Sequence, residues 1–470
     1  MNAAFRRIFG KKFAEKSNTF DNAKKTEGAA GAPVGEGWMA TIVGVSRAGF
    51  GALALLLAAA GGAPAQNESA PSRYTFAVVH AFKGPSDGAF PWAGLVKADD
   101  GNLYGTSWAG GSHPGCKGGL GVGCGALFRL DASGKESVIY SFVGLPGAIH
   151  LYGELLPSHD GSFYGVTNEG GTSTDCYNGC GTVFRLDARH RLTVLYNFGS
   201  NGGTGDANWP AGDLLRDGDG NLYGTSSTGG VNNNGTIFEV SRSGAETVLY
   251  RFTGGSDGAG PSSDLLLDSA GNLYGTASGG GGSCSCGTVF RLDPAGVLTV
   301  LYTFTGGTAG ANPLAGLVQD SAGNFWGITA GGGDSSCAGG YGCGTVFRLA
   351  PDGTETVIHA FSGSPDGELP VSRLTPDRRG NLYGVTYVGG DSACDNGVGC
   401  GAVYEISSKG NERVLHAFTG GKHGSWPWGQ LYLDGAGNVL GTTQQGGKFG
   451  VCANGCGIVY KLSPASKNPR

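Results

Sequence analysis

The stretch Gly101-Asn102-Leu103-Tyr104-Gly105 decides the fold, because close copies of it recur along most of the chain. A repeated period in the range of 50 to 60 residues is typical of architectures built from one supersecondary unit. Seven such units fill the chain from about residue 74 to residue 462. The copies begin at Gly101, Gly161, Gly220, Gly271, Gly323, Gly380 and Gly437.

Each unit carries four short apolar runs. The first two are represented by residues 93–96 and 102–106 of the first unit, and the other two by residues 181–186 and 193–198 of the second. The runs are rich in β-branched and aromatic residues and are bounded by Gly, Asp and Asn, which is typical of strands joined by tight turns. Four antiparallel strands repeated seven times predict an all-β, seven-bladed β-propeller over residues 75–465.

The two ends of the repeat region are out of phase with the units between them. Residues 76–82 read as a lone fourth-type strand, and residues 458–462 read as a third-type strand. If these two strands pair, the N-terminal strand completes the C-terminal blade and the ring closes. Closure removes two edges that would otherwise be free to pair with other chains.

The units resemble the Gloeo/Verruco (GloVer) tandem repeat of exported bacterial proteins, and their strand order is similar to that of NHL-type propeller blades. The resemblance covers about residues 75–465 and is carried by the seven copies of G-N-L-Y-G, with G-T-V-F-R-L and T-V-L-Y-x-F. That family has no assigned reaction. The resemblance therefore implies export and repetition, and it does not imply a particular chemistry.

The N-terminal segment has the order of an export signal. A charged region follows Met39, an apolar block spans residues 48–62, and Ala63-Pro64-Ala65 fits a cleavage site. We expect residues 1–38 to be untranslated or a disordered leader, 39–65 a signal peptide, 66–74 a linker and 466–470 a tail. The alternative is a membrane anchor, but Arg47 leaves the apolar run short of the ~20 residues that a span needs.

Charge and export together limit the partners. Lys and Arg number 32 against 37 Asp and Glu, so no basic surface invites nucleic acid. We expect a secreted, periplasmic or cell-surface protein that is a monomer, without a membrane span in the mature chain.

The twelve cysteines fall into six pairs, each in the loop between the second and third strands of a unit. An even count, a fixed location and an export signal together predict local disulfides. A shared zinc site is disfavoured because neighbouring blades hold their pairs at least ~10 Å apart. The pairs are Cys116/Cys124, Cys176/Cys180, Cys284/Cys286, Cys337/Cys343, Cys394/Cys400 and Cys452/Cys456.

One position of the innermost strand varies in charge from unit to unit. It directly precedes the Leu of the first run and follows a small residue, which suits crowding near the axis. Three neighbouring units place a carboxylate there, so a divalent cation or a hydroxyl-rich ligand fits the channel mouth, although solvated channel charges are the alternative. The seven residues are Gly94, Glu154, Asp213, Asp264, Gly316, Arg373 and Gln430.

Aromatic residues gather in the loops between the fourth strand of one unit and the first strand of the next. These loops lie on the same face as the disulfide loops, so their rings would form platforms for a sugar or a protein, or would cover the ends of blades. The candidate binding residues are Trp92, Trp209, Trp426 and Trp428, with Phe90 and Trp108 beside them.

Three histidines, His80, His359 and His416, occupy the fourth-strand position that holds Tyr in the other units. Because each lies on a different blade, no single metal ion can bridge them. We interpret them as packing residues with a polar tip.

Two functions remain open. The favoured one is an exported binding or scaffold protein that recognises a glycan or a protein through its disulfide-stapled loop face, with no cofactor required. The alternative is an exported propeller enzyme of the lyase or lactone-hydrolase type, with a divalent metal at the channel mouth held by Glu154, Asp213 and Asp264. No H-E-x-x-H motif is present in the chain, and we identify no nucleophile elbow that opens a helix.

Overall fold

The computed structural model describes residues 74–113, 123–144, 148–176, 178–199, 206–337, 340–448 and 450–465. The expected leader, the signal peptide, nearly all of the linker and the tail lie outside these ranges. Within them, no helix is both long enough and apolar enough to cross a membrane.

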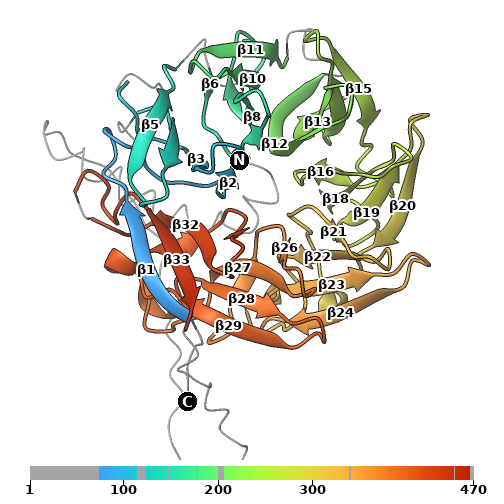
Figure 1. Ribbon diagram of the computed structural model, residues 1–470. Helices are drawn as coiled ribbons and strands as arrows, with labels where there is room; N and C mark the ends of the chain where they lie inside the picture. The colour runs from blue at the N-terminus through green and yellow to red at the C-terminus, as the bar shows by residue number, and fades with distance from the viewer. Residues whose placement is uncertain are drawn as a thin grey trace, which may run out of the picture. The chain divides into compact units, whose positions relative to one another are not determined.

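The described strands form seven antiparallel sheets that surround a central axis as the blades of a propeller (Figure 1). Blade 1 contains β2 (Val96–Lys97), β3 (Leu103–Ser107), β4 (Ala126–Leu130) and β5 (Glu136–Ser141). Blade 2 contains β7 (Leu156–Pro157), β8 (Phe163–Thr167), β10 (Thr182–Leu186) and β11 (Leu192–Asn197), and blade 3 contains β12 (Ala207–Arg216), β13 (Leu222–Gly229), β14 (Thr236–Val240) and β15 (Glu246–Arg251).

In three of the remaining four blades, the innermost strand is divided into two short pieces. Blade 4 contains β16 (Ala259–Pro261), β17 (Leu266–Leu267), β18 (Leu273–Gly279), β19 (Thr288–Leu292) and β20 (Leu298–Thr303), and blade 5 contains β21 (Val318–Gln319), β22 (Phe325–Thr329), β23 (Thr345–Leu349) and β24 (Glu355–Ala360). Blade 6 contains β25 (Glu368–Pro370), β26 (Thr375–Pro376), β27 (Leu382–Val388), β28 (Ala402–Ile406) and β29 (Glu412–Ala417). Blade 7 contains β30 (Ser425–Pro427), β31 (Tyr432–Leu433), β32 (Val439–Gln445), β33 (Ile458–Pro464) and β1 (Tyr74–Ala81).

A few short elements lie between the blades' strands. The pair β6 (Ala148–Ile149) and β9 (Glu169–Gly170) forms a small two-stranded ladder. Three single 3₁₀ turns are η2 (Gly307–Ala309), η4 (Asp395–Gly397) and η5 (Gly421–His423).

The ring closes as the sequence predicts. The N-terminal strand β1 pairs antiparallel with β33, from Tyr74 opposite Pro464 to Ala81 opposite Ile458. In Figure 1 the two ends of the colour scale, blue β1 and red β33, lie side by side. Blade 7 is therefore built from both ends of the repeat region.

The last Gly of the G-N-L-Y-G motif makes room for the aromatic ring of G-T-V-F-R-L. In blade 2, Gly165 lies opposite Phe184 in the strand register, and a Cβ on Gly165 would lie only 2.6 Å from Phe184 Cζ. In blade 4, a Cβ on Gly275 would lie 2.7 Å from Phe290 Cζ. Such distances are too short for carbon atoms, so the two motifs recur together because one fills the space that the other leaves.

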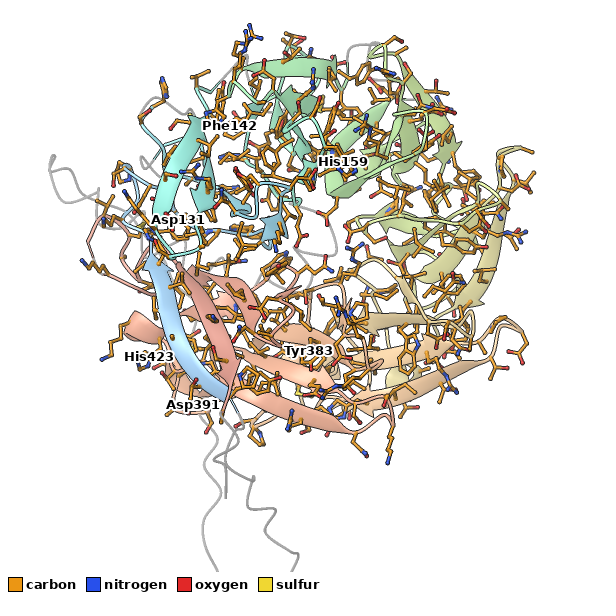
Figure 2. The ribbon with its side chains drawn as sticks, viewed as in Figure 1. Asp131, Phe142, His159, Tyr383, Asp391 and His423 are labelled. Atoms are coloured by element: carbon orange, nitrogen blue, oxygen red, sulfur yellow. A yellow bond between two sulfur atoms is a disulfide. The ribbon has the colours of Figure 1, made fainter. Side chains whose placement is uncertain are left out.

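The Phe of the T-V-L-Y-x-F motif joins each blade to the next. Phe142, which is labelled in Figure 2, follows β5 of blade 1. Its ring meets that of Phe184 of blade 2 edge to face, with ring centroids 5.8 Å apart. Both side chains are buried. Edge-to-face pairs of the same kind recur at all seven junctions: Phe82–Phe128, Phe142–Phe184, Phe198–Phe238, Phe252–Phe290, Phe304–Phe347, Phe361–Tyr404 and Phe418–Tyr460.

The Asp before the motif closes the turn into the second strand. In blade 3, Asp217 Oδ1 accepts hydrogen bonds from the backbone N–H groups of Asp219 and Asn221. Its Oδ2 accepts from the side chains of Asn221 and Tyr223, 2.9 and 3.0 Å away. The Asn and Tyr of the motif are thereby explained by one carboxylate.

Candidate functional site

The variable position of the innermost strand forms a chain of polar contacts around the axis. We call the five side chains Glu154, Asp213, Asp264, Arg373 and Gln430 the polar ring. The backbone N–H of Glu154 donates to Asp213 Oδ1, and the N–H of Asp213 donates to Asp264 Oδ1 at 2.7 Å. Asp264 Oδ2 lies 3.6 Å from Arg373 Nε, and Arg373 Nη2 donates to Gln430 Oε1 at 2.8 Å.

Gly94 and Gly316 hold the same position in blades 1 and 5, and their lack of a side chain makes room for residues of the neighbouring blades. A Cβ on Gly94 would collide with Glu154 Oε1 and with the carbonyl of Gln430, and a Cβ on Gly316 would lie 2.9 Å from Asp264 Cβ. Glu154 Oε1 and the Gln430 carbonyl thus approach each other over Gly94, which closes the sequence of neighbours around the axis. The structure thus brings together every polar residue that the sequence analysis placed at the channel mouth.

Three carboxylates of the polar ring share one cation. Burial, followed by the charge of Asp213, raises the pKa of Glu154 well above its usual value. Burial and then the charge of Asp264 raise the pKa of Asp213 to about 7. Burial acts to lower the pKa of Arg373, but the three carboxylates outweigh it and raise that pKa. Asp213 therefore binds a proton near neutral pH.

The carboxylates of the polar ring do not converge on one point. Two of them already accept backbone N–H groups of the neighbouring blade. Within the described ranges, Glu154, Asp213 and Asp264 are not among the sets of three potential ligands whose ligand atoms lie within 4.8 Å of one another. The single coordination sphere that the enzyme alternative requires is not formed by these three side chains.

Three of the predicted tryptophans and two tyrosines that were not predicted form an aromatic layer next to the polar ring. The aromatic layer comprises Trp92, Tyr152, Tyr387, Trp426 and Trp428. The Trp92 ring lies 5.0 Å from that of Tyr152 and 5.2 Å from that of Trp428. Tyr387 continues the layer, with ring centroids 5.4 Å from Trp428 and 5.7 Å from Trp426. All except the buried Tyr387 are half-exposed.

Short spacing along the chain relates the aromatic layer to the polar ring. Tyr152 precedes Glu154 by two residues and Trp428 precedes Gln430 by two, in each case across a bend at the intervening Gly. Trp92 likewise stands two residues before Gly94, whose missing side chain makes room for Glu154 Oε1 and the Gln430 carbonyl. The same position in blades 3 and 4 holds the small residues Ala211 and Ser262, so the aromatic rings are confined to one side of the axis.

Tyr152 and Tyr387 belong to the aromatic layer although neither was predicted from the sequence, and the predicted Trp209 does not join it. Tyr152 was predictable from its place two residues before Glu154, the spacing of Trp92 and Gly94. Tyr387 lies at the end of β27 and carried no such signal. Trp209 lies in β12 and is half-exposed, and among described aromatic pairs it has no partner ring.

Five of the six predicted disulfides lie within the described residues, and all five are formed. Cys124 is also disulfide-bonded, while its predicted partner Cys116 lies outside the described ranges. No described cysteine is free. The formed bridges are Cys176–Cys180, Cys284–Cys286, Cys337–Cys343, Cys394–Cys400 and Cys452–Cys456.

Three of the described disulfide loops also support the aromatic loop of the next blade. The backbone N–H of Trp426 donates to the carbonyl of Cys400 at 2.9 Å, and that of Trp209 donates to Cys180 at 2.9 Å. Phe90 makes the same bond to Cys456. The three donors have φ values of 53 to 62°, a conformation that costs energy in residues other than Gly, Asn and Asp. The stapled cysteine thus holds a strained loop residue in place.

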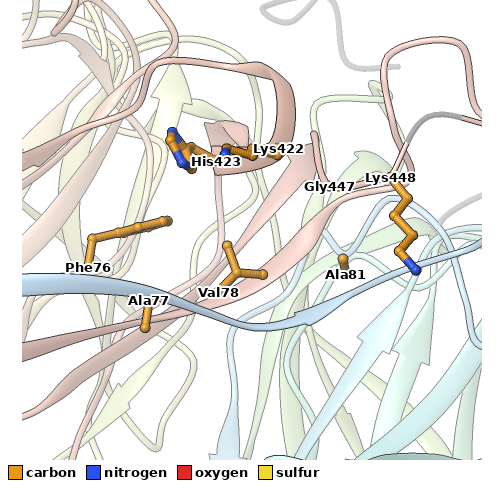
Figure 3. A pocket seen from close by; sticks show the side chains of 8 residues that line it. All are labelled: Phe76, Ala77, Val78, Ala81, Lys422, His423, Gly447 and Lys448. Carbon is orange, nitrogen blue, oxygen red and sulfur yellow. The ribbon is translucent and has the colours of Figure 1, made fainter.

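One further hollow lies at the outer edge of the ring, away from the polar ring and the aromatic layer. Figure 3 shows this pocket of about 410 Å³ beside the closing strand β1. It holds none of the predicted site residues. Its lining residues are Phe76, Ala77, Val78, Ala81, Lys422, His423, Gly447 and Lys448.

The three histidines do pack as polar-tipped substitutes for Tyr, with partners that the sequence analysis did not name. His80 Nε2 lies 3.2 Å from Asp87 Oδ2, just as Tyr250 donates to Asp257 Oδ2 at 3.1 Å in blade 3. His416 instead stacks on Phe76 with ring centroids 4.1 Å apart. The Asp residues come from the S-D-G loops whose repetition was visible in the sequence.

Comparison with solved structures returns other proteins at low identity. The extracellular domain of a one-component system from B. thetaiotaomicron is 16% identical to this chain, with a TM-score of 0.48. The match covers 83% of this chain and 42% of the other, so this chain spans less than half the length of that protein. A glucose dehydrogenase-type oxidoreductase from Thermus thermophilus is 16% identical, with a TM-score of 0.40 over 83% and 99%. A gluconolactonase from Xanthomonas campestris is 17% identical, with a TM-score of 0.35 over 60% and 78%.

Sequence comparison is more informative about ancestry than these structures are. No curated protein matches the chain. Two segments, residues 114–339 and 335–469, match the profile of the Gloeobacter/Verrucomicrobia repeat and together cover well over half of the chain. The seven-bladed chain therefore belongs to the Gloeobacter/Verrucomicrobia repeat family.

Proposed function

We propose that this protein is an exported binding protein that recognises a glycan at the mouth of its central channel. The single observation that carries the proposal is the aromatic layer standing directly beside the polar ring. Aromatic rings offer flat apolar surfaces on which the C–H faces of sugars pack. Carboxylates accept hydrogen bonds from sugar hydroxyls, while Arg373 and Gln430 donate to them.

The disulfides support this proposal because they stiffen the loops that carry the aromatic rings. Cys400 holds the backbone of Trp426, and the Cys394–Cys400 bridge fixes Cys400. A binding surface that is ordered before the ligand arrives loses less conformational entropy on binding. Local bridges of this kind also persist only in an oxidising compartment, which fits an exported protein.

The experiment that tests the proposal is a glycan array probed with the folded, oxidised protein. We expect binding to a subset of oligosaccharides, and we expect the double substitution Trp92→Ala and Trp428→Ala to abolish it. Trp209→Ala is the matched control, because it removes the same type of side chain outside the aromatic layer. Binding that survives the double substitution but is lost with Trp209→Ala would refute the assignment. A protein that binds no glycan but captures a protein partner through Trp92 and Trp428 would support the surface and refute the ligand class.

A second candidate, cleavage of the bound sugar or lactone, is favoured by one observation. The backbone N–H of Glu154 donates to Asp213 Oδ1, and burial with the charge of Asp264 raises the pKa of Asp213 to about 7. A carboxyl group whose pKa lies near the working pH is suited to act as a general acid or base. Release of product from any glycan that binds, lost in Asp213→Asn while binding persists, would identify an enzyme. If the protein binds a glycan but releases no product over days, the enzyme candidate is refuted and the binding function stands.

A further inference from the structure

The junction between blade 7 and blade 1 holds a set of three potential metal ligands. His80 comes from the closing strand β1, Asp87 from the loop that follows it, and Glu136 from the start of β5 in blade 1. One ligand atom from each side chain lies within 4.8 Å of the other two. Asp87 is buried and His80 is 15% exposed, so the cluster lies inside the junction.

The spacing of the cluster suits a small tetrahedral ion. Zinc binds His nitrogen and carboxylate oxygen at about 2.0 to 2.2 Å, so two ligands at a tetrahedral angle lie roughly 3.3 Å apart. His80 Nε2 and Asp87 Oδ2 are 3.2 Å apart. An ion between them would replace their mutual hydrogen bond without moving either side chain far.

The surroundings of the cluster also favour an ion. Oε1 of Glu136 is buried and has no hydrogen-bond partner, an arrangement that costs free energy unless something fills it. The other oxygen of Asp87, Oδ1, accepts the backbone N–H of Lys83 at 2.7 Å, which fixes the orientation of the carboxylate. Such outer hydrogen bonds are typical of carboxylates that bind metals.

We propose that His80, Asp87 and Glu136 bind one divalent transition-metal ion of the Zn²⁺ class, with water as the fourth ligand. The donor set of one imidazole and two carboxylates suits zinc, and calcium rarely takes nitrogen ligands. The ion ties the closing strand β1 to the outer strand of blade 1. It therefore acts as a structural staple at the junction where the two ends of the repeat region meet. This site is independent of the polar ring and of the proposed glycan function.

The repeats supply internal comparisons for the same three positions. The junction between blades 3 and 4 holds Tyr250, Asp257 and Leu298, in which Tyr250 donates to Asp257 and no metal ligand set exists. Tyr250, Asp257 and Leu298 thus show which residues pack such a junction without a set of metal ligands.

A nearer copy lies between blades 5 and 6. His359 Nε2 lies 3.1 Å from Asp366 Oδ2, and Oε1 of Glu412 is buried without a hydrogen bond. Its ligand atoms do not meet the 4.8 Å condition that the first cluster meets. We therefore assign the ion to the first junction and use the second as the control.

The test is a zinc titration of the tag-free, oxidised chain after removal of metal with a chelator. Calorimetry should show about one strong Zn²⁺ site per chain, and Zn²⁺ should raise the Tm. The double variant His80→Tyr with Glu136→Leu rebuilds the ion-free junction of blades 3 and 4, so it should fold. It should lose at least about 100-fold in Zn²⁺ affinity, since removal of an outer-shell partner alone already costs 10- to 100-fold.

The control variant makes the same two substitutions, His359→Tyr and Glu412→Leu, at the junction of blades 5 and 6. It should keep the wild-type affinity and the Zn²⁺-dependent rise in Tm. If the first double variant does not fold, His80→Tyr alone gives the same comparison, because Tyr keeps the hydrogen bond to Asp87. A wild-type chain without a strong site, or unchanged affinity in the variants at His80, would overturn the proposal.

Discussion

Replacing Arg373 by Met should destabilise the ring, and more so at high pH than at low pH. Arg373 is the one cation of the polar ring and contacts Asp264 and Gln430. Met keeps much of the apolar stem but leaves three carboxylates facing one another. Removing one partner of a buried ion pair typically costs 3–5 kcal/mol. Because the Arg373 side chain is 32% exposed, solvent screening reduces our expectation to about 2–3 kcal/mol.

The pH dependence follows from the carboxylates that remain. Without Arg373, the pKa values of Glu154 and Asp213 rise further, so both groups are neutral in the folded protein at pH 5. At pH 8 the two carboxyl groups must either ionise and repel each other or stay protonated although the solution favours their ionised form. A shift of one pKa unit corresponds to about 1.4 kcal/mol, so the loss should be larger at pH 8 by at least that amount.

The assay is thermal unfolding of wild type and variant at pH 5 and pH 8. With an unfolding entropy of about 2.1 cal/mol/K per residue, a loss of about 2.5 kcal/mol over residues 74–465 lowers the Tm by about 3 °C. Arg378→Met, which removes an exposed Arg of the same blade, is the control and should change the Tm little. An Arg373→Met variant that loses as much stability at pH 5 as at pH 8 would refute this reasoning.

Three other perturbations test the repeat, the junctions and the staples. Gly275→Ala should lower the free energy of unfolding, measured with urea, by about 2 kcal/mol because the new Cβ overpacks against Phe290. In the control Gly218→Ala the new Cβ meets no atom within 4 Å, so its stability should be nearly unchanged. Equal effects of the two substitutions would contradict the packing argument. Burial raises the pKa of Glu246 to about 7, so the free energy of unfolding of wild type falls as the pH rises from about 4.5 through 7. Relative to wild type, the free energy of unfolding of Glu246→Gln should therefore increase by about 1–2 kcal/mol between pH 5 and pH 8, after allowance for solvent screening. A variant whose advantage over wild type is larger at pH 5 than at pH 8 would contradict this reasoning. Reduction of the disulfides should leave the far-UV circular dichroism unchanged but open the loops to proteolysis, and collapse of the sheet signal would show that the bridges hold the blades themselves.

Much of the fold was predictable because the repeat records it seven times. The Gly of G-N-L-Y-G and the Phe of G-T-V-F-R-L recur together since each Gly faces an aromatic ring, as Gly165 faces Phe184. The phase of residues 76–82 and 458–462 predicted ring closure. The residues of the polar ring were predictable from a single position in the innermost strand, because a propeller points that position of every blade toward one axis.

Contacts between blades were not predictable in the same way. Glu136 lies more than fifty residues from His80, and only the docking of blade 1 against β1 brings them together. His80 was interpreted only as a packing residue in place of Tyr, because the sequence does not show that a strand, a loop and the next blade converge there. Tyr387 was missed for the same reason, since its neighbour Trp428 comes from another blade.

The most direct test of the proposed function is calorimetric titration of the best array ligand into wild type, Trp92→Ala with Trp428→Ala, and Trp209→Ala. If the aromatic layer forms the site, the double variant should lose at least about tenfold in affinity, which corresponds to about 1.4 kcal/mol, while Trp209→Ala stays within about twofold. Equal affinities for all three proteins would contradict the account.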